Sequence, residues 1–381
     1  MRIKIAYLIN HSSFFVSHIY PIALQASKNN YEVKLFCGAG GSIKMEKYAE
    51  KFLKKKKIKF EKFKFSAANL NIFVEFISFW KLLLAIKRFN PSILHAATSK
   101  GILYGGLIGI ILNIKGLVLF VTGLGYLFSN KLNTAQKIAK HFYLNIVNLI
   151  FKKKNLQLII ENKNDYNYYR NKYNLKKKIK LIKGSGVDTL IFKPEKKKKK
   201  LVILPSRVLK EKGITEFVNA AFVLKKKFPQ WEFVIIGALD YKKTSAYTKI
   251  ELAELKKKSV KFVGYTNNML KFYREASIVC LPSYREGFSK SLVEASACGI
   301  PIVTTNVTGC RDVIVNKKSG LLCKVQDVNS LKKQIEFLIR HKDIRIKYGN
   351  FGAKLAKKNY DIKIIVNKNL EIYKKLIANY V

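Results

Sequence analysis

Two glutamates, Glu286 and Glu294, are separated by seven residues within the segment 282–301. A strand is expected to end where this segment begins, Gly287 permits a tight turn, and a helix is expected to begin near Ser289 or Lys290. The first N–H groups of such a helix can bind an anion, and carboxylates accept strong hydrogen bonds from sugar hydroxyls. The segment therefore predicts a phosphate site beside a polyol site. The alternative is an ordinary strand-to-helix turn with two solvated glutamates.

Short apolar runs alternate with longer helical segments along the chain, which is typical of β-α-β units around a parallel sheet. Ligands of such sheets bind beyond the carboxyl ends of the strands, so residues that follow strands are the functional candidates. In the first half the expected strands are Lys4–Ile9, Glu32–Cys37, Lys59–Phe63, Ile93–Ala96, Gly116–Thr122, Gln157–Glu161 and Ile179–Ile182. In the second half they are Leu201–Pro205, Glu232–Gly237, Val260–Gly264, Ile278–Pro282 and Pro301–Thr304.

The chain is long enough, at 381 residues, for two domains of similar size. Between the two sets of strands lies Phe192–Lys200, a proline followed by like charges that repel one another, as expected of an exposed linker. We place the boundary near residue 195, which gives domains 1–194 and 195–360. The segment 361–381 is expected to be helical.

The charge of the chain is strongly positive, with 73 Lys and Arg against 24 Asp and Glu and a formal net charge of +49. A field of that sign attracts nucleic acid, anionic lipid and nucleotide diphosphates alike. Much of the excess lies in monotonous lysine runs, which A/T-rich codon usage explains as well as a function does. Charge alone therefore selects no partner, and a hydrophobic content of 49% excludes only a disordered chain.

Cysteine usage and hydropathy favour a cytoplasmic setting. The five cysteines show neither a C-x-x-C pair nor the spacing of a zinc site, and the N-terminus enters a strand without a signal peptide. The longest apolar stretch, Gly101–Leu112, falls short of the roughly 20 residues that span a bilayer. We expect it to form a buried helix.

The string Glu286–Glu294 resembles the E-x7-E element of the retaining glycosyltransferases of family 4, which have the GT-B fold. The likeness covers essentially all of the second domain, through Arg207–Gly213, Ile236–Gly237, Phe262–Tyr265 and Gly299–Val303. The resemblance implies an α/β GT-B fold in which two Rossmann-like domains face each other across a cleft. It also implies that the helix at 361–381 packs back on the first domain.

The same resemblance assigns roles on the donor side. Arg207 and Lys212 would bind the donor diphosphate, Glu286 the donor sugar and Glu294 the ribose hydroxyls. Fixed cations suit this task because charge develops on the leaving phosphate as the sugar–phosphate bond breaks; the alternative is two more cations in a lysine-rich chain. Further donor-side candidates are Gly287, Phe288, Ser289, Ser291, Leu292 and Tyr265. Tyr265 would lie beside the base of the nucleotide; the alternative is a partly buried aromatic residue at the rim of the site.

Three segments that follow strands in the first half resemble the branch of the family that extends polyprenyl-diphosphate-linked sugars or builds capsule and O-antigen repeats. This resemblance implies that Lys100 binds a phosphate of the lipid-linked acceptor. Gly123 and Gly125 would let the backbone come close to the acceptor or the donor. The histidines among them are alternatively structural. The acceptor-side candidates are His18, His95, Lys100, Thr122, Gly123 and Gly125.

The first half also departs from the family pattern. Many members carry a histidine where this chain has Thr122–Gly125, and a glycine-rich loop where it has His11–Phe14. The resemblance implies transfer with retention, in which the donor's own phosphate accepts the proton of the incoming hydroxyl. An Asp-x-Asp motif is absent from the sequence, so we expect no metal and no cofactor, with Arg207, Lys212 and a helix N-terminus meeting the charge.

The resemblance implies a peripheral enzyme at the inner face of the cell membrane that moves a sugar, an N-acetylhexosamine, from a UDP-sugar to a polyprenyl-diphosphate-linked saccharide. Ile72–Phe89 and Ile138–Lys154 are apolar helix candidates with terminal cations, which suits an anionic membrane surface; packing on the sheet is the alternative. Other functions stay open: a lipopolysaccharide-core or capsule transferase with another nucleotide-sugar donor, a sugar-nucleotide hydrolase or epimerase, and charge-driven nucleic-acid binding. The chain shows no nucleic-acid-binding motif, so nucleic acid is not the expected partner.

Overall fold

The computed structural model describes residues 2–38, 42–65, 72–123, 134–175, 177–195, 198–240 and 245–378. The chain divides into two compact units, of which unit 1 is Met1–Ser185 with Ile365–Val381 and unit 2 is Gly186–Ile364. This division comes ahead of the boundary expected at 194/195. The reason is that Val187 donates to the Tyr360 carbonyl (2.9 Å) and accepts from the Ile362 N–H (2.8 Å), which ties the segment after Ser185 to unit 2.

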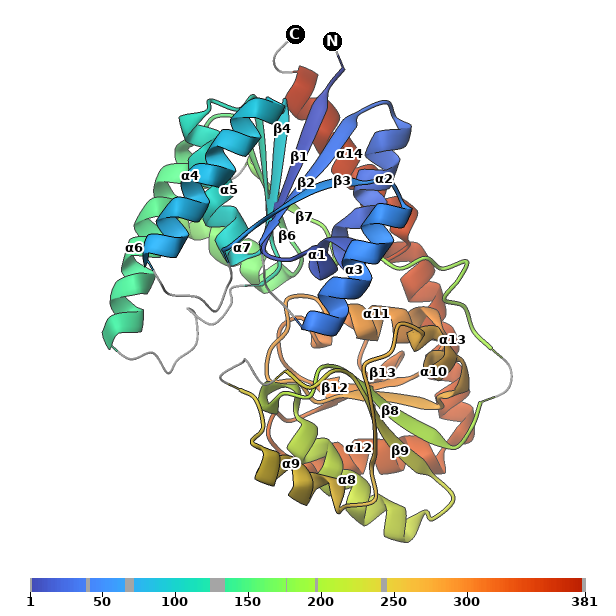
Figure 1. The fold of residues 1–381 in the computed structure, drawn as a ribbon. Helices are drawn as coiled ribbons and strands as arrows, with labels where there is room; N and C mark the ends of the chain where they lie inside the picture. Colours follow the sequence, from blue (N-terminus) through green and yellow to red (C-terminus); the bar gives the residue numbers. More distant parts are fainter. Residues whose placement is uncertain are drawn as a thin grey trace. The chain divides into compact units, whose positions relative to one another are not determined.

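Unit 1 is built on a parallel sheet whose order, among the described residues, is β3-β2-β1-β4-β5-β6-β7 (Figure 1). The order reverses between β1 and β4, as in doubly wound sheets. The central strands are buried on both faces, which explains their nearly continuous apolar sequences. The strands are β1 (Lys4–Ile9), β2 (Glu32–Gly38), β3 (Lys59–Phe63), β4 (Ile93–Ala97), β5 (Gly116–Val121), β6 (Leu156–Ile160) and β7 (Ile179–Leu181).

The helices of unit 1 cover both faces of this sheet. Ala6 and Leu8 of β1 share a core with α4, α5 and α6, whereas Tyr7 points to the opposite face, because successive strand residues alternate. The helices are α1 (Ser12–Phe14), the π-helical η1 (Phe15–Ile19), α2 (Tyr20–Lys28), α3 (Ile43–Lys55), α4 (Ile72–Phe89), α5 (Ser99–Ile111), α6 (Thr134–Lys152) and α7 (Lys163–Lys172).

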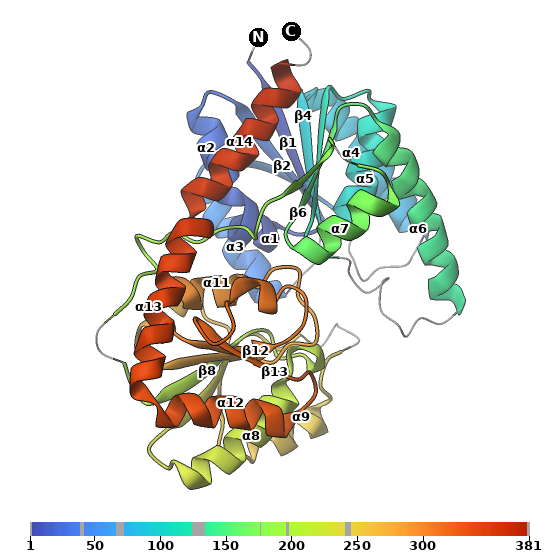
Figure 2. The same cartoon turned by 180° about the vertical axis from the view of Figure 1, so that it is seen from behind.

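The last helix, α14 (Ile362–Ala378), begins in unit 2 and groups with unit 1 from Ile365 onward. Figure 2 shows it across the face of the first sheet that is turned away from α4 and α5. Tyr373 of α14 is fully buried there and its hydroxyl lies 2.6 Å from Nδ1 of His95 on β4. The C-terminal segment is therefore part of the core of unit 1.

Unit 2 repeats the plan with a parallel sheet of order β10-β9-β8-β11-β12-β13 in the described residues. Its strands are β8 (Leu201–Pro205), β9 (Glu232–Ile236), β10 (Lys261–Gly264), β11 (Ile278–Leu281), β12 (Ile302–Thr305) and β13 (Gly320–Cys323). Its helices are η3 (Lys210–Lys212), α8 (Ile214–Lys227), α9 (Lys249–Lys256), α10 (Met269–Glu275), α11 (Lys290–Ala297), η4 (Arg311–Val313), α12 (Val328–Arg340) and α13 (Lys342–Asn359). The sequence patterns anticipate these strands except β13.

The long apolar stretch that begins at Gly101 forms most of α5 and is buried, as predicted. Its glycines allow close packing: a Cβ on Gly105 would lie 2.5 Å from Cβ of Ala96, and one on Gly106 would lie 2.4 Å from Cδ1 of Ile150. Within the described ranges we find no helix that combines the length and apolar character needed to cross a bilayer.

Candidate active site

The candidate site in unit 2 is built on two neighbouring parallel strands, β8 and β11. Their carboxyl ends lie at one edge of the sheet, so the loops that follow them come together. The carbonyl of Glu211, in the first loop, accepts from the Tyr284 N–H (2.8 Å) and the Ser283 hydroxyl (3.1 Å) of the second. These hydrogen bonds fix the two loops to each other.

This arrangement brings Lys212 to Glu286. The Nζ of Lys212 lies 2.6 Å from Oε1 of Glu286, and the side chains are only 15% and 16% exposed. Gly213 makes the approach possible, because its φ of +70° is a left-handed conformation and a Cβ there would lie 2.2 Å from the Pro282 carbonyl oxygen. Two residues predicted to act on the donor are thus in direct contact across the two loops.

Arg207 is held separately, by an acidic residue that follows β9. Its Nη1 lies 2.8 Å from Oδ2 of Asp240, whose side chain is 13% exposed while that of Arg207 is 40% exposed. The guanidinium is therefore anchored at one end and open to solvent at the other. Asp240 was not predicted from the sequence, although its position four residues after a strand is a usable signal.

The turn between β11 and α11 is packed against a second turn at Gly309. A Cβ on Gly309 would lie 2.4 Å from the Glu286 carbonyl oxygen, and the Ser289 N–H donates to the Gly309 carbonyl (3.0 Å). The helix begins at Lys290, as predicted. The Ser289 N–H is thus paired within the protein, which leaves the hydroxyl of this donor-side candidate for a ligand.

Glu294 lies within α11, one turn after Lys290 and near the hydroxyl of fully buried Tyr273, which donates to the Ser291 carbonyl (3.1 Å). Loss of solvation raises the pKa of Glu294, and the nearby Lys290 ammonium offsets part of that rise. Burial likewise lowers the pKa of Lys290. Lys290 and Tyr273 were not singled out in the sequence; the spacing of four residues within a helix is the signal that links Lys290 to Glu294.

The other donor-side candidates differ in what they can offer a ligand. The side chains of Phe288 and Leu292 turn into the core and are 7% and 0% exposed, so only their main chains remain for binding. The hydroxyls of Ser289 and Ser291 lie 3.2 Å apart at the start of α11. Tyr265 follows the edge strand β10, three positions from β11 in the sheet, or about 14 Å at ~4.8 Å per strand.

Most acceptor-side candidates that the structure describes follow the neighbouring strands β1, β4 and β5 of unit 1. His18 lies in the π-helical turn η1, stacked on Phe14 with 4.2 Å between ring centroids, and its Nδ1 is 2.6 Å from the Ser17 hydroxyl. The Nζ of Lys100 lies 2.8 Å from Oε1 of Glu75 on α4. Thr122 and Gly123 directly follow β5, and Gly123 has a φ of +116°. Gly125 lies outside the described residues.

His95 is not an acceptor-side residue in this structure, which corrects the sequence prediction. It lies within β4, opposite Tyr7 of β1, and is 0% exposed. Its Nδ1 bonds the Tyr373 hydroxyl, and burial lowers the pKa of His95 to about 3. The strand runs through Ala97, beyond the predicted end, so the imidazole is packed under α14 rather than presented at the sheet edge.

The two parallel α/β units define the GT-B class of fold. The structure is similar to sucrose-phosphate synthase from Thermosynechococcus elongatus, with a TM-score of 0.78, 18% identity, and coverage of 99% of this chain and 100% of the other. It is also similar to the HepE protein of Anabaena, with a TM-score of 0.76, 16% identity, and coverage of 98% and 100%.

Sequence comparison gives the family. The model described as "Glycosyl transferases group 1" matches residues 187–355, and "Glycosyl transferase 4-like" matches residues 4–162. A Campylobacter jejuni relative named N,N'-diacetylbacillosaminyl-diphospho-undecaprenol alpha-1,3-N-acetylgalactosaminyltransferase is 30% identical over 332 residues, 83% of this chain and 86% of the relative. The capsular polysaccharide glycosyltransferase CapM of Staphylococcus aureus is 28% identical over 42% of each chain. The chain belongs to the GT-B glycosyltransferases of family 4 and is an enzyme of that class.

Proposed function

We propose that the protein transfers an N-acetylhexosamine from a UDP-sugar to a polyprenyl-diphosphate-linked saccharide at the cytoplasmic face of a membrane, with retention of the anomeric configuration. The observation that carries this proposal is the contact of Lys212 with Glu286 in the loops after β8 and β11. This contact places a cation that can bind a phosphate beside a carboxylate that can bind a sugar, and both side chains are largely buried. The name of the Campylobacter jejuni relative supports the choice of sugar and acceptor.

In the proposed reaction the bond from the anomeric carbon to the β-phosphate oxygen breaks, and a bond forms from that carbon to the acceptor hydroxyl oxygen. The hydroxyl proton passes to the departing phosphate, so the products are UDP and the extended saccharide. Lys212, Arg207 and the first N–H groups of α11 face the negative charge that grows on the phosphate. Glu286 binds hydroxyls of the sugar and Glu294 binds those of the ribose.

The cations of the site take the role that a divalent metal has in other transferases, so we propose transfer without a metal or cofactor. Among the described residues, His, Cys, Asp and Glu side chains form no group of three or more that is suited to a metal ion. Turnover in the presence of EDTA should equal turnover without it. Loss of activity with EDTA that added Mg²⁺ or Mn²⁺ restores would contradict this part of the proposal.

The proposal is tested first by thermal unfolding in the presence of UDP-GalNAc, UDP-GlcNAc, UDP-glucose, GDP-mannose and ADP-glucose. A ligand that binds only the folded state raises the midpoint, so a rise with one UDP-N-acetylhexosamine is expected. That donor is then incubated with a polyprenyl-diphosphate-linked saccharide, and the product's anomeric configuration is read by NMR. A midpoint that rises only with GDP-mannose or ADP-glucose, or a product of inverted configuration, would contradict the proposal.

A further inference from the structure

Helix α4 of unit 1 carries apolar side chains on the side that faces away from the sheet. Phe73, Ile77, Trp80 and Leu84 follow one another at intervals of four, three and four residues, which places them in one stripe along the helix. Their exposed fractions are 80%, 53%, 46% and 54%. Large apolar side chains gathered in this way on a surface indicate contact with an apolar phase or partner.

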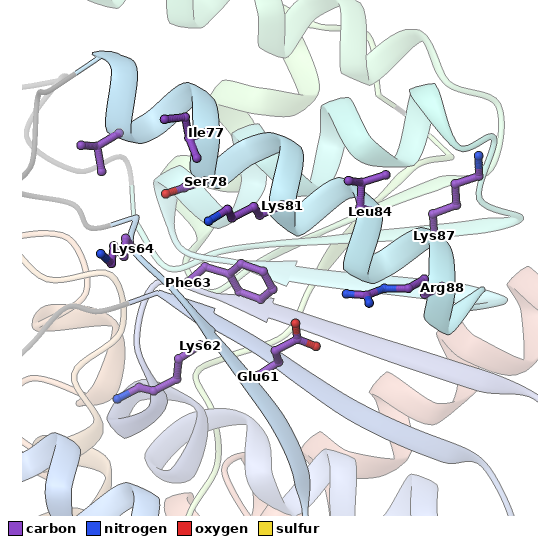
Figure 3. Close-up of a pocket in the computed structure, with 11 residues that line it drawn as sticks. Glu61, Lys62, Phe63, Lys64, Ile77, Ser78, Lys81, Leu84, Lys87 and Arg88 are labelled. Atoms are coloured by element: carbon purple, nitrogen blue, oxygen red, sulfur yellow. The ribbon is translucent and has the colours of Figure 1, made fainter.

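Beside this stripe lies a hollow of about 820 Å³ between α4 and the edge strand β3 (Figure 3). Figure 3 shows Phe63 and Glu61 on the strand side of the hollow and Lys81 and Arg88 on the helix side. The lining has one carboxylate, that of Glu61, and five cations: Lys62, Lys64, Lys81, Lys87 and Arg88.

Most of these cations are not neutralised by the protein. Glu61 pairs with Lys34 outside the hollow (2.9 Å), and Lys62 pairs with Glu50. In the part of the chain that the structure describes, the remaining four cations, Lys64, Lys81, Lys87 and Arg88, form no ion pair. The hollow therefore presents concentrated positive charge directly beside an exposed apolar stripe.

We propose that these four cations bind the phosphates of anionic phospholipids while the stripe Phe73, Ile77, Trp80 and Leu84 enters the membrane interface, so that this α4 surface docks unit 1 on the bilayer. An apolar contact or a basic patch alone gives weak membrane binding, whereas the two together give stable binding. Nucleic acid would match the charge but offers no apolar phase for the stripe. The inference goes beyond the proposed reaction and uses none of the donor-site residues.

The test is co-sedimentation of the full chain, without nucleotide, with phosphatidylcholine vesicles that contain or lack phosphatidylglycerol. In the variant Lys81→Gln/Arg88→Gln the partition onto anionic vesicles should fall about 25-fold, because each cation near an anionic surface contributes a factor of about five. The matched control Lys347→Gln/Lys354→Gln removes the same charge from exposed positions on α13 and should change partition less than about twofold. Unchanged unfolding midpoints verify that both variants are folded.

A second measurement follows the stripe itself. The chain has two tryptophans, and Trp231 is only 3% exposed, so Trp231→Phe leaves Trp80 as the single reporter. Emission from Trp80 should shift to shorter wavelength on anionic vesicles and stay unchanged with phosphatidylcholine alone, because the indole leaves water for the interface.

Several results would overturn the inference. If the two double variants lose vesicle binding equally, net charge alone drives binding. The inference also fails if Lys81→Gln/Arg88→Gln partitions onto anionic vesicles as well as the wild type does. It fails too if the emission of Trp80 does not shift in protein that sediments with vesicles. The surface would instead be assigned to nucleic acid if mixed-sequence RNA displaced the protein from vesicles and Lys81→Gln/Arg88→Gln no longer bound that RNA. Donor-induced thermal shifts are recorded separately for each variant, so a failure of the docking surface is distinct from a failure of the proposed reaction.

Discussion

Replacement of Lys212 by Met tests the leaving-group role most directly. The ammonium and its partner Glu286 are about 15% exposed, so the charge acts at an effective dielectric constant of about 20. At that dielectric two unit charges about 4 Å apart interact by about 4 kcal/mol. If this interaction is made with the phosphate charge that develops in the transition state, its loss lowers the rate about 10³-fold. We therefore expect kcat/KM of Lys212→Met to fall by about three orders of magnitude.

The assay is the initial rate of transfer to a lipid-linked saccharide over a range of donor concentrations. Lys210→Met is the matched control, because Lys210 belongs to the same η3 turn but pairs with Glu251 (2.5 Å) and is 45% exposed. It should retain kcat/KM within about twofold, as expected for an exposed ion pair. Equal losses in the two variants, or a Lys212→Met enzyme within about threefold of wild type, would refute the leaving-group role.

Stability is separated from catalysis by a second substitution. In Lys212→Met the partly buried carboxylate of Glu286 loses its partner, which costs about 1–3 kcal/mol of unfolding free energy. Lys212→Met/Glu286→Gln removes the stranded charge and should recover most of that loss in urea unfolding. Activity should remain low in the double variant. Recovery of activity together with stability would show that Lys212 acts only through the fold.

Three further predictions follow from the structure. Glu286→Gln removes a carboxylate that competes with the diphosphate for Lys212, so calorimetry should show UDP affinity about fivefold higher while turnover falls. Gly213→Ala should cost about 2 kcal/mol or more in urea unfolding, because φ is +70° and the new Cβ meets the Pro282 carbonyl, whereas Gly264→Ala, at φ +82° with nothing nearby, should cost about 1–2 kcal/mol. Burial lowers the pKa of His95 to about 3, whereas the imidazole of the unfolded chain binds a proton below about pH 6.5. As the pH falls from about 6.5 to about 3, the unfolding free energy should therefore decrease by about 1.4 kcal/mol per pH unit. The variant His95→Phe should lack this contribution to the slope.

The sequence predicts the strand-end positions of the donor-site residues but not their contacts. Lys212 and Glu286 are 74 residues apart, and the strands that carry them are separated in the chain by β9 and β10. They meet because β8 and β11 are neighbours in the sheet. That adjacency follows from a reversal of strand order, which local hydrophobic periodicity does not encode.

His95 illustrates why its own placement could not be predicted from the sequence. Apolar alternation cannot distinguish a histidine inside a buried strand from one just beyond its end, and the deciding partner, Tyr373, lies 278 residues later on α14. The strand β13, which the sequence patterns missed, is defined by its pairing with β12, a tertiary contact that its own residues do not reveal.

The two units also use their first strand-to-helix turns in different ways. In unit 1 the carboxylate of Glu46, from α3, accepts from the N–H groups of Ser12 (3.1 Å) and Ser13 (3.0 Å) and from the Ser12 hydroxyl (2.6 Å). A phosphate placed there would meet a buried negative charge instead of open N–H groups. In unit 2 the corresponding turn after β8 carries Arg207 and Lys212. The absence of a glycine-rich loop at His11–Phe14 and the internal use of these N–H groups are thus one feature, and it supports the proposal that unit 2 binds the charged end of the donor.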